Sequence, residues 1–138
     1  MLHVPGLYIA HSEGRGRGVF TSIELSAGDI IEFCPIVIVP KEDQSKIHHS
    51  FLHDYYFLSP APDPQFCLVF GYGSIYNHQS TANAEIVFDI PNLTIEIHCI
   101  AAIEPGSEIF IDYTGGIKVP PNCGLIQFER SRERTGAV

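Results

Sequence analysis

The sequence predicts a mostly β fold built from short strands, and three observations lead to this prediction. The chain of 138 residues contains 12 glycines and 10 prolines, which favour frequent turns over long helices. Short runs of apolar, β-branched and aromatic residues lie between these turns, as is typical of strands. Hydrophobic residues make up 45% of the chain, which is enough for a packed core in a single domain of residues 1–138.

The apolar runs give the expected strands in order along the chain. Pro35 lies inside the third run, which therefore predicts either two short strands or one strand with a break. Pro91 and Asn92 form a turn signal between two later runs and predict a hairpin there. The pattern gives seven to nine short strands in all. The main runs are residues 7–10, 19–21, 30–39, 66–70, 85–90, 93–100 and 108–112.

The segments between the runs differ in composition. Residues 13–18 (EGRGRG) hold three glycines and predict a loop. Residues 41–49 fit one helical turn or a loop, and the aromatic residues 51–58 fit a strand or a helix. Residues 59–65 (SPAPDPQ) hold three prolines and predict a surface loop. Residues 71–84 are polar and irregular, and an irregular segment of this length inside a compact domain tends to carry function.

The formal net charge of −8 indicates which partners the chain suits. An acidic protein repels nucleic-acid phosphates and attracts a lysine-rich peptide, although the same charge can serve solubility alone. The sequence shows no signal-peptide pattern, and no apolar run approaches the roughly 20 residues of a membrane span. We therefore expect a soluble protein of the cytoplasm or nucleus, with export to a host left open.

The cysteines and a histidine cluster do not predict a metal site. Cys67 and Cys99 lie inside apolar runs, where buried free thiols belong. His48, His49 and His53 lie close together in sequence, but no H-E-x-x-H motif accompanies them, so we expect solvated loop histidines. No C-x-x-C pair occurs among the four cysteines, which are Cys34, Cys67, Cys99 and Cys123.

Three motifs lie in order along the chain. Residues 15–20 (RGRGVF) carry a Gly-x-Gly-Val-Phe pattern, and residues 72–83 (YGSIYNHQSTAN) carry an Asn-His pair followed by Asn83. Residues 106–113 (GSEIFIDY) end in an Asp-Tyr pair. Together they resemble the opening, central and closing motifs of the SET domain, a family of protein-lysine methyltransferases. The resemblance covers about residues 6–115 and is greatest to the minimal stand-alone forms of viruses and bacteria.

The resemblance implies a particular version of the β fold. SET domains have a β-clip-like fold of several small sheets, in which the closing motif passes under a loop and forms a C-terminal pseudoknot. Threading of this kind would make Asn77 and Tyr113 neighbours. Residues 116–138 would be a C-terminal extension, and residues 117–128 or a second copy of the chain would complete the substrate groove, so a homodimer is one alternative.

The resemblance also implies a reaction, the transfer of a methyl group from S-adenosylmethionine to a lysine of a basic protein, with a histone tail as one candidate. It places Tyr113 and Tyr55 at the catalytic end of an aromatic channel and Tyr72 and Tyr76 on its wall. Aromatic rings hold the aliphatic stem of lysine and keep water out. The residues expected to bind the cofactor are Arg15, Gly16, Arg17, Gly18, Tyr76, Asn77 and His78, the last through its backbone.

Several residues depart from the family motifs and keep other hypotheses open. Gln79, Ser80 and Ala82 replace the usual residues after the Asn-His pair, and Ser107 replaces the first acid of the closing motif, whereas Glu108 keeps the second. One alternative is a SET-like module that binds a partner or the cofactor without turnover. Another is a β-rich, clip-like domain without a cofactor.

Overall fold

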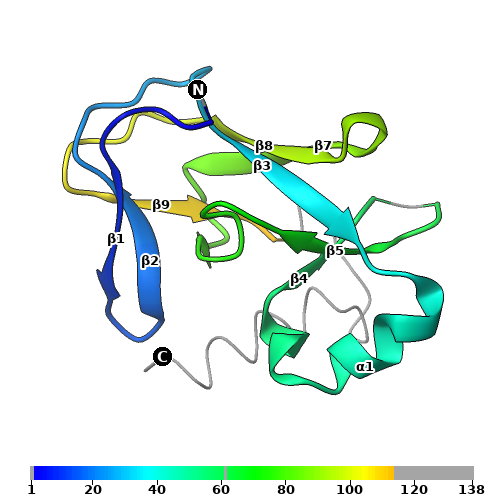
Figure 1. Cartoon of the computed structure of the whole chain (residues 1–138). Helices are drawn as coiled ribbons and strands as arrows, with labels where there is room; N and C mark the ends of the chain where they lie inside the picture. The colour runs from blue at the N-terminus through cyan, green and yellow to red at the C-terminus, as the bar shows by residue number, and fades with distance from the viewer. Residues whose placement is uncertain (1, 61, 114–138) are drawn as a thin grey trace.

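The computed structural model describes residues 2–60 and 62–113, which contain nine strands and a few short helical turns (Figure 1). The mostly β prediction is confirmed. The predicted C-terminal extension, with residues 117–128 and Cys123, lies outside the described residues. The strands are β1 (Leu7–Ser12), β2 (Gly16–Thr21), β3 (Ile30–Ile38), β4 (Tyr56–Leu58), β5 (Phe66–Val69), β6 (Asn77–His78), β7 (Ala84–Asp89), β8 (Thr94–Cys99) and β9 (Glu108–Ile111). The helical turns are η1 (Lys41–Asp43), α1 (Gln44–His48), η2 (Phe51–Asp54) and η3 (Ile90–Asn92).

The strand pairings in the described part form one continuous curled path rather than separate small sheets. The order is β1-β2-β9-β7-β8-β3-β5-β4, and β6 pairs with β9 outside this path. The last of the described strands in sequence, β9, therefore lies inside the path, between β2 and β7 (Figure 1). It is antiparallel to β2 and parallel to β6 and β7. The expected pseudoknot needs the closing motif inside the sheet, and β9 lies there.

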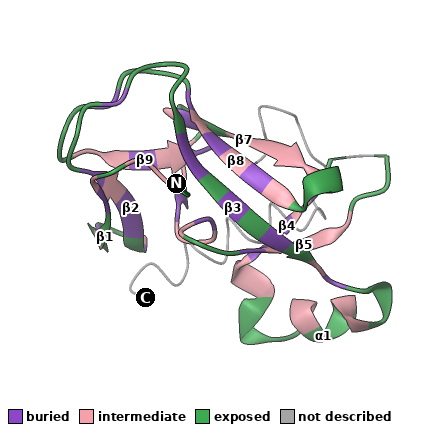
Figure 2. Cartoon of the chain, turned by 45° about the horizontal axis from the view of Figure 1, so that its top comes forward, coloured by how far each residue is buried: buried purple, intermediate pink, exposed green. Residues whose placement is uncertain are grey.

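Strand β3 is a single strand, and its irregularity does not lie at Pro35. The carbonyl of Pro35 accepts the N–H of Phe70 at 2.9 Å, so this proline still takes part in pairing. The register instead shifts between Ile30 and Glu32, where a bulge turns two consecutive residues inward. Ile31 and Glu32 are both buried, and the alternation of buried and exposed residues resumes along the rest of the strand (Figure 2).

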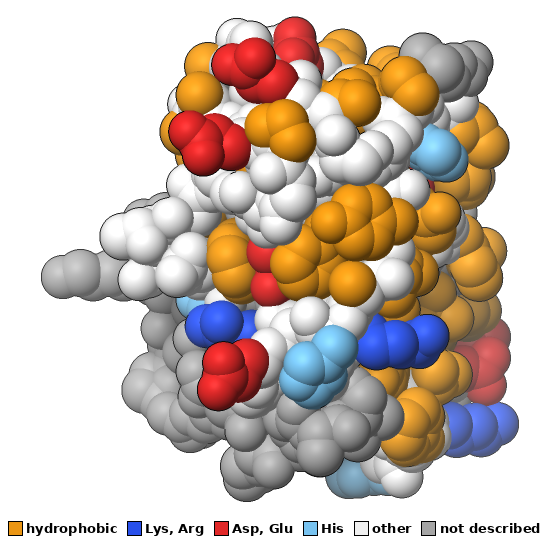
Figure 3. Space-filling model, turned by 90° about the vertical axis from the view of Figure 1, so that its left-hand side faces the viewer, with side chains coloured by type: hydrophobic (Ala, Val, Ile, Leu, Met, Phe, Trp, Pro, Cys, Tyr) orange, Lys and Arg blue, Asp and Glu red, His pale blue; other side chains and the backbone are white. Residues whose placement is uncertain are grey.

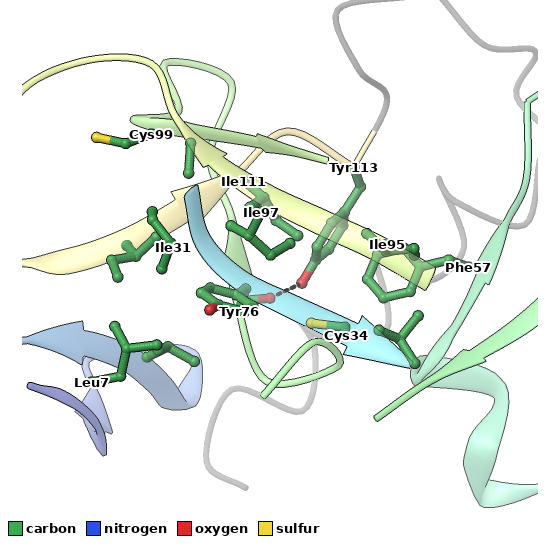
Figure 4. Close-up of a cluster of buried hydrophobic side chains, with 14 of the residues drawn as sticks. Leu7, Ile31, Cys34, Phe57, Tyr76, Ile95, Ile97, Cys99, Ile111 and Tyr113 are labelled. Carbon is green, nitrogen blue, oxygen red and sulfur yellow. Dashed lines mark hydrogen bonds between the residues drawn. The ribbon is translucent and has the colours of Figure 1, made fainter. Parts of the chain in front are cut away.

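The core lies inside the curl and is built from alternating residues of the central strands (Figure 4). Ile95 and Ile97 of β8 and Ile109 and Ile111 of β9 are at most 1% exposed. The predicted burial of Cys67 and Cys99 as free thiols is confirmed, and burial raises the pKa of both.

None of the helices in residues 2–60 and 62–113 is long and apolar enough to cross a membrane.

Three histidines gather at the end of α1 and in η2. The Nδ1 of His48 lies 3.0 Å from the hydroxyl of Tyr56, and its ring centroid lies 4.6 Å from that of His53 and 5.2 Å from that of His49. Burial lowers the pKa of His48, and the two neighbouring rings lower it further. The neutral form of His48 is therefore the one that the fold favours.

We expect the protein to lose stability when the pH falls through the normal titration range of histidine. The pKa of His48 is lower in the folded chain than its ordinary value of 6.5, so the unfolded chain takes up the proton first. The stability that neutral His48 provides is present above this value and is lost below it. Urea unfolding at about pH 7.5 and about pH 5.5 measures the change. A His48→Gln variant with the same pH dependence as the wild type would contradict this assignment.

Candidate functional site

The candidate site forms where β6 and β9 pair in parallel, because this pairing brings the end of the closing motif onto the Asn-His segment. The hydroxyl of Tyr113 donates a hydrogen bond of 2.6 Å to the carbonyl of Tyr76, although the two residues are 37 positions apart. Tyr113 is 3% exposed, and its side chain points into the core toward Tyr76 (Figure 4). The structure therefore brings the two motif segments together around this hydroxyl.

The ring of His78 helps to hold Tyr113. Its Nδ1 accepts the backbone N–H of Tyr113 at 3.0 Å, and the two ring centroids are 5.0 Å apart. A nitrogen that accepts carries no hydrogen, so we place the proton of the neutral ring on Nε2. A carboxylate oxygen of Asp112 also lies 3.7 Å from Nδ1, but an accepting nitrogen cannot donate to it. The sequence predicted that His78 acts through its backbone in cofactor binding. The structure shows that its ring also has a structural role, because it holds the backbone of Tyr113.

Asn77 connects the glycine-rich strand β2 with β9. It is 1% exposed, and its Nδ2 donates to the carbonyl of Arg17 at 3.0 Å and to Oε2 of Glu108 at 2.8 Å. The other carboxylate oxygen of Glu108 accepts the hydroxyl of Ser12 at 2.6 Å. A Cβ at Gly18 would collide with both the carboxylate of Glu108 and the amide of Asn77. Position 18 therefore requires a glycine because the side chains of Glu108 and Asn77 lie where a Cβ would be.

We expect Gly18→Ala to destabilise the protein by about 1–3 kcal/mol, because the added methyl group would push Glu108 and Asn77 apart. Urea unfolding measures the loss. The double variant Gly18→Ala/Glu108→Ala should lose less than the sum of the single variants, since removing the carboxylate relieves much of the collision. Gly14→Ala in the same hairpin is the control, because open space surrounds Gly14 and only its φ of 75° opposes a side chain. Additive losses at positions 18 and 108 would contradict the collision.

The two arginines of the first motif take different positions. The guanidinium carbon of Arg15 lies 5.2 Å from the ring centroid of Phe110, which is a cation–π distance. The side chain of Arg17 is exposed on β2, and its carbonyl is the part that reaches Asn77. The face that holds β1 and β2 shows basic side chains next to hydrophobic ones (Figure 3). Arg15 is therefore the arginine whose side chain lies against β9.

Tyr76 and Tyr72 both reach the buried carboxylate of Glu32. The hydroxyl of Tyr76 donates to Oε1 at 2.7 Å, and the backbone N–H of Tyr72 donates to Oε2 at 2.9 Å. Burial raises the pKa of Tyr76 well above its usual value and the charge of Glu32 raises it further, so this hydroxyl stays protonated. The ring of Tyr72 stacks on His3 with centroids 5.5 Å apart. Tyr76 thus faces Tyr113 with its carbonyl, and the channel roles of both rings stay predictions.

The aromatic segment before β5 provides a neighbour of Tyr113 that the sequence did not identify. Phe57 is 1% exposed and meets the ring of Tyr113 edge-on, with centroids 5.6 Å apart. Tyr55 is half-buried against the core, and its ring centroid lies 5.5 Å from that of Phe51. The catalytic role of Tyr55 stays a prediction, whereas the contact of Phe57 with Tyr113 is observed.

Asn83, the second asparagine of the central motif, holds β9 by its backbone. Its Nδ2 donates to the carbonyl of Glu108 at 3.0 Å, and its Oδ1 accepts the N–H of Phe110 at 2.8 Å. Both ends of one side-chain amide are therefore bound to the same strand. This double contact fixes the position of β9 and, with it, of Tyr113 at the end of the closing motif.

Comparisons with known proteins agree with this geometry. A Schizosaccharomyces pombe protein described as a histone-lysine N-methyltransferase specific for H3 lysine 37 is 28% identical over 108 residues, which span 78% of this chain and 72% of the relative. A solved structure of a Plasmodium falciparum protein, described as a histone methyltransferase, has a TM-score of 0.63 and 29% identity over 78% of this chain and 92% of its own. A second solved structure, from work on the product specificity of histone lysine methyltransferases, has a TM-score of 0.65 and 19% identity. The match spans 86% of this chain and 54% of that one, and it shows the shared fold.

The family follows from the motifs, the strand order and a direct match. Residues 16–114 match the model of the SET domain, and this range includes the central and closing motifs together with Gly16 and Gly18 of the opening one. Tyr113 contacts Tyr76 and His78, the residues on either side of Asn77, and the resemblance implied that these two segments lie close together. The chain belongs to the SET domain family.

Proposed function

We propose that the protein is an S-adenosylmethionine-dependent protein-lysine N-methyltransferase that acts on a basic protein, with a histone tail as one candidate. The observation that carries the proposal is the hydroxyl of Tyr113, which is held 2.6 Å from the carbonyl of Tyr76 where the two motif segments meet. Membership of the SET domain family and the similarity to a histone-lysine methyltransferase support it.

The groups around this junction have the chemistry that the cofactor needs. When bound, S-adenosylmethionine supplies a methyl group on a positively charged sulfonium. Arg15 offers a cation for its carboxylate, and Asn77 with the backbone of His78 offers hydrogen-bonding groups for its amino and adenine parts. The carbonyl of Tyr76 and the hydroxyl oxygen of Tyr113 suit a positively charged methyl group. These residues fit the cofactor, and their roles in binding it are part of the proposal.

The hydroxyl of Tyr113 would act toward a lysine amine as a hydrogen-bond acceptor. Its own hydrogen is donated to the carbonyl of Tyr76, so toward any further group its oxygen can only accept. An amine that donates an N–H to this oxygen keeps its own lone pair for attack on the methyl carbon. A tyrosine that donated to the amine would occupy that lone pair and block the reaction. The geometry thus aligns the nucleophile without disabling it.

The surroundings of Tyr113 favour a neutral lysine. Tyr113, Tyr76 and Phe57 are at most 3% exposed, so water has little access to the hydroxyl of Tyr113. A lysine side chain that enters an environment of low polarity loses its proton more easily, because burial disfavours the charged form. The overall charge of −8 would attract a basic substrate from solution.

The proposal is tested by incubating the protein with methyl-labelled S-adenosylmethionine and a panel of lysine-rich proteins, including histones. The control panel carries the same proteins with their lysines chemically acetylated, which converts the nucleophilic amines to amides. Label that enters only the unblocked proteins supports the proposal. Cofactor binding without label transfer would favour a binding module, to which Gln79 and Ala82 point, and absence of cofactor binding would overturn both.

A further inference from the structure

Glu32 is a buried carboxylate that is surrounded by neutral donors. It is 2% exposed, and its oxygens accept the hydroxyl of Tyr76 at 2.7 Å and the backbone N–H of Tyr72 at 2.9 Å. Burial and then the charge of Glu32 raise the pKa of the nearby Cys34 thiol, which therefore stays protonated. Within residues 2–60 and 62–113, no Lys, Arg or His side chain forms an ion pair with Glu32.

The surrounding chain is shaped to accept this carboxylate. Gly71 has a φ of 67°, and a Cβ at this position would collide with Oε2 of Glu32. The next residue, Tyr72, then directs its backbone N–H at the same oxygen. A buried charge without a cation is costly, and an apolar residue of similar size fills a core at lower cost. Core packing alone therefore does not explain a glutamate at position 32.

The hydrogen bonds of Tyr76 connect Glu32 with Tyr113. At one end of Tyr76 the hydroxyl is held by Glu32, and at the other end the carbonyl accepts the hydroxyl of Tyr113 at 2.6 Å. Tyr76 is completely buried, and tight packing leaves its ring no room to move on its own. A shift of the ring would therefore also shift the backbone carbonyl of Tyr76. Figure 4 shows the ring of Tyr76 lying in the core with its carbonyl directed at Tyr113.

We infer that Glu32 is a positioning residue for methyl transfer, which acts by fixing Tyr76 and thereby the carbonyl that orients the hydroxyl of Tyr113. This inference rests on the proposed function, because it concerns the rate of that reaction. Glu32 does not touch the reacting atoms in this scheme. Its effect is to hold Tyr113 with its lone pairs toward the lysine amine, and small displacements of such a group have large effects on rate.

Two variants interrupt the connection at different points. Tyr76→Phe removes only the hydroxyl and keeps the ring and the backbone carbonyl, while Glu32→Gln keeps the shape of the side chain and removes its charge. We expect each to lower kcat by about tenfold or more with the KM for S-adenosylmethionine unchanged. The double variant should be no slower than the slower single variant, because both changes act along one path. Independent, multiplying losses would overturn the inference.

The control for a general loss of stability is Ile36→Val, a buried substitution on the same strand β3. We expect it to lower the unfolding temperature slightly and to leave kcat unchanged when assayed well below that temperature. If Ile36→Val lowers kcat as much as Glu32→Gln does, the effect of Glu32 is structural only, and the inference is wrong.

A measurement without turnover separates this inference from the proposed function. The six tyrosines can be labelled as 3-fluorotyrosine, and the fluorine resonance of Tyr113 identified from its absence in Tyr113→Phe. This resonance should shift in Glu32→Gln and Tyr76→Phe and stay in place in Ile36→Val. An unmoved Tyr113 resonance in Glu32→Gln would overturn the inference even in an active enzyme. A wild type that transfers no methyl group would instead overturn the proposed function, whatever the resonance does.

Discussion

Replacing Tyr113 with phenylalanine is expected to lower the rate of methyl transfer by about a hundredfold while the cofactor still binds. The variant keeps the ring that packs edge-on against Phe57 and loses only the hydroxyl. That hydroxyl is the group we propose as acceptor for the lysine amine, and its bond to the carbonyl of Tyr76 fixes its direction. The amine would then lose its alignment with the methyl group, which is a loss of rate rather than of cofactor affinity.

The measurement is kcat for label transfer together with the dissociation constant of S-adenosylmethionine by calorimetry. Tyr8→Phe is the matched control, because Tyr8 is a surface tyrosine of β1, 38% exposed and stacked on Phe20. We expect Tyr8→Phe to transfer label at the rate of the wild type. Equal rates for Tyr113→Phe and the wild type would show that the hydroxyl of Tyr113 has no part in the reaction.

Asn83→Ala is expected to have the largest effect on stability, a loss of about 3 kcal/mol in the free energy of unfolding. The substitution removes the side-chain amide of Asn83. The carbonyl of Glu108 and the N–H of Phe110 then both lose their hydrogen bonds to Asn83. Each group left without a partner in a partly buried place costs about 1–3 kcal/mol. A loss of this size is a large fraction of the total stability of a small domain.

Urea unfolding with a shared m-value measures this loss. Asn92→Ala is the matched control, since the amide of Asn92 donates to Asp89 at 2.8 Å in an exposed turn. An exposed contact of this kind contributes little, and we expect a change within about 0.5 kcal/mol. Equal losses for the two asparagines would show that the contact of Asn83 with β9 does not stabilise the fold.

The sequence was informative where local pattern decides the structure. The alternation of apolar residues located β7 and β8 and the hairpin at Pro91 and Asn92, because period and turn chemistry are local properties. The neighbourhood of Asn77 and Tyr113 came from the resemblance alone. No local pattern specifies that β6 and β9 pair in parallel, since that depends on the path of the whole chain.

The residues that the sequence did not reveal depend on contacts between distant segments. In the run IIEFCPIVI, Glu32 looks like an ordinary outward-facing polar residue of a strand, and the bulge after Ile30 is what turns it inward. The glycine-rich motif predicted a cofactor near Gly18, which stays a prediction, and it did not reveal that Asn77 and Glu108 approach this glycine. The break in strict alternation within β3 was the one signal that could have indicated that Glu32 is buried.

The position of β9 between β2 and β7 also affects how the chain folds during synthesis. The ribosome releases β1 and β2 before residues 108–111, yet β2 and β7 are joined through β9 in the described sheet. Their edges must therefore wait without partners during synthesis, and unpaired strand edges are the segments most prone to associate wrongly. A nascent chain that stalls before residue 108 would lack both β9 and Tyr113, so the closing of the sheet and the arrival of the proposed catalytic hydroxyl should coincide.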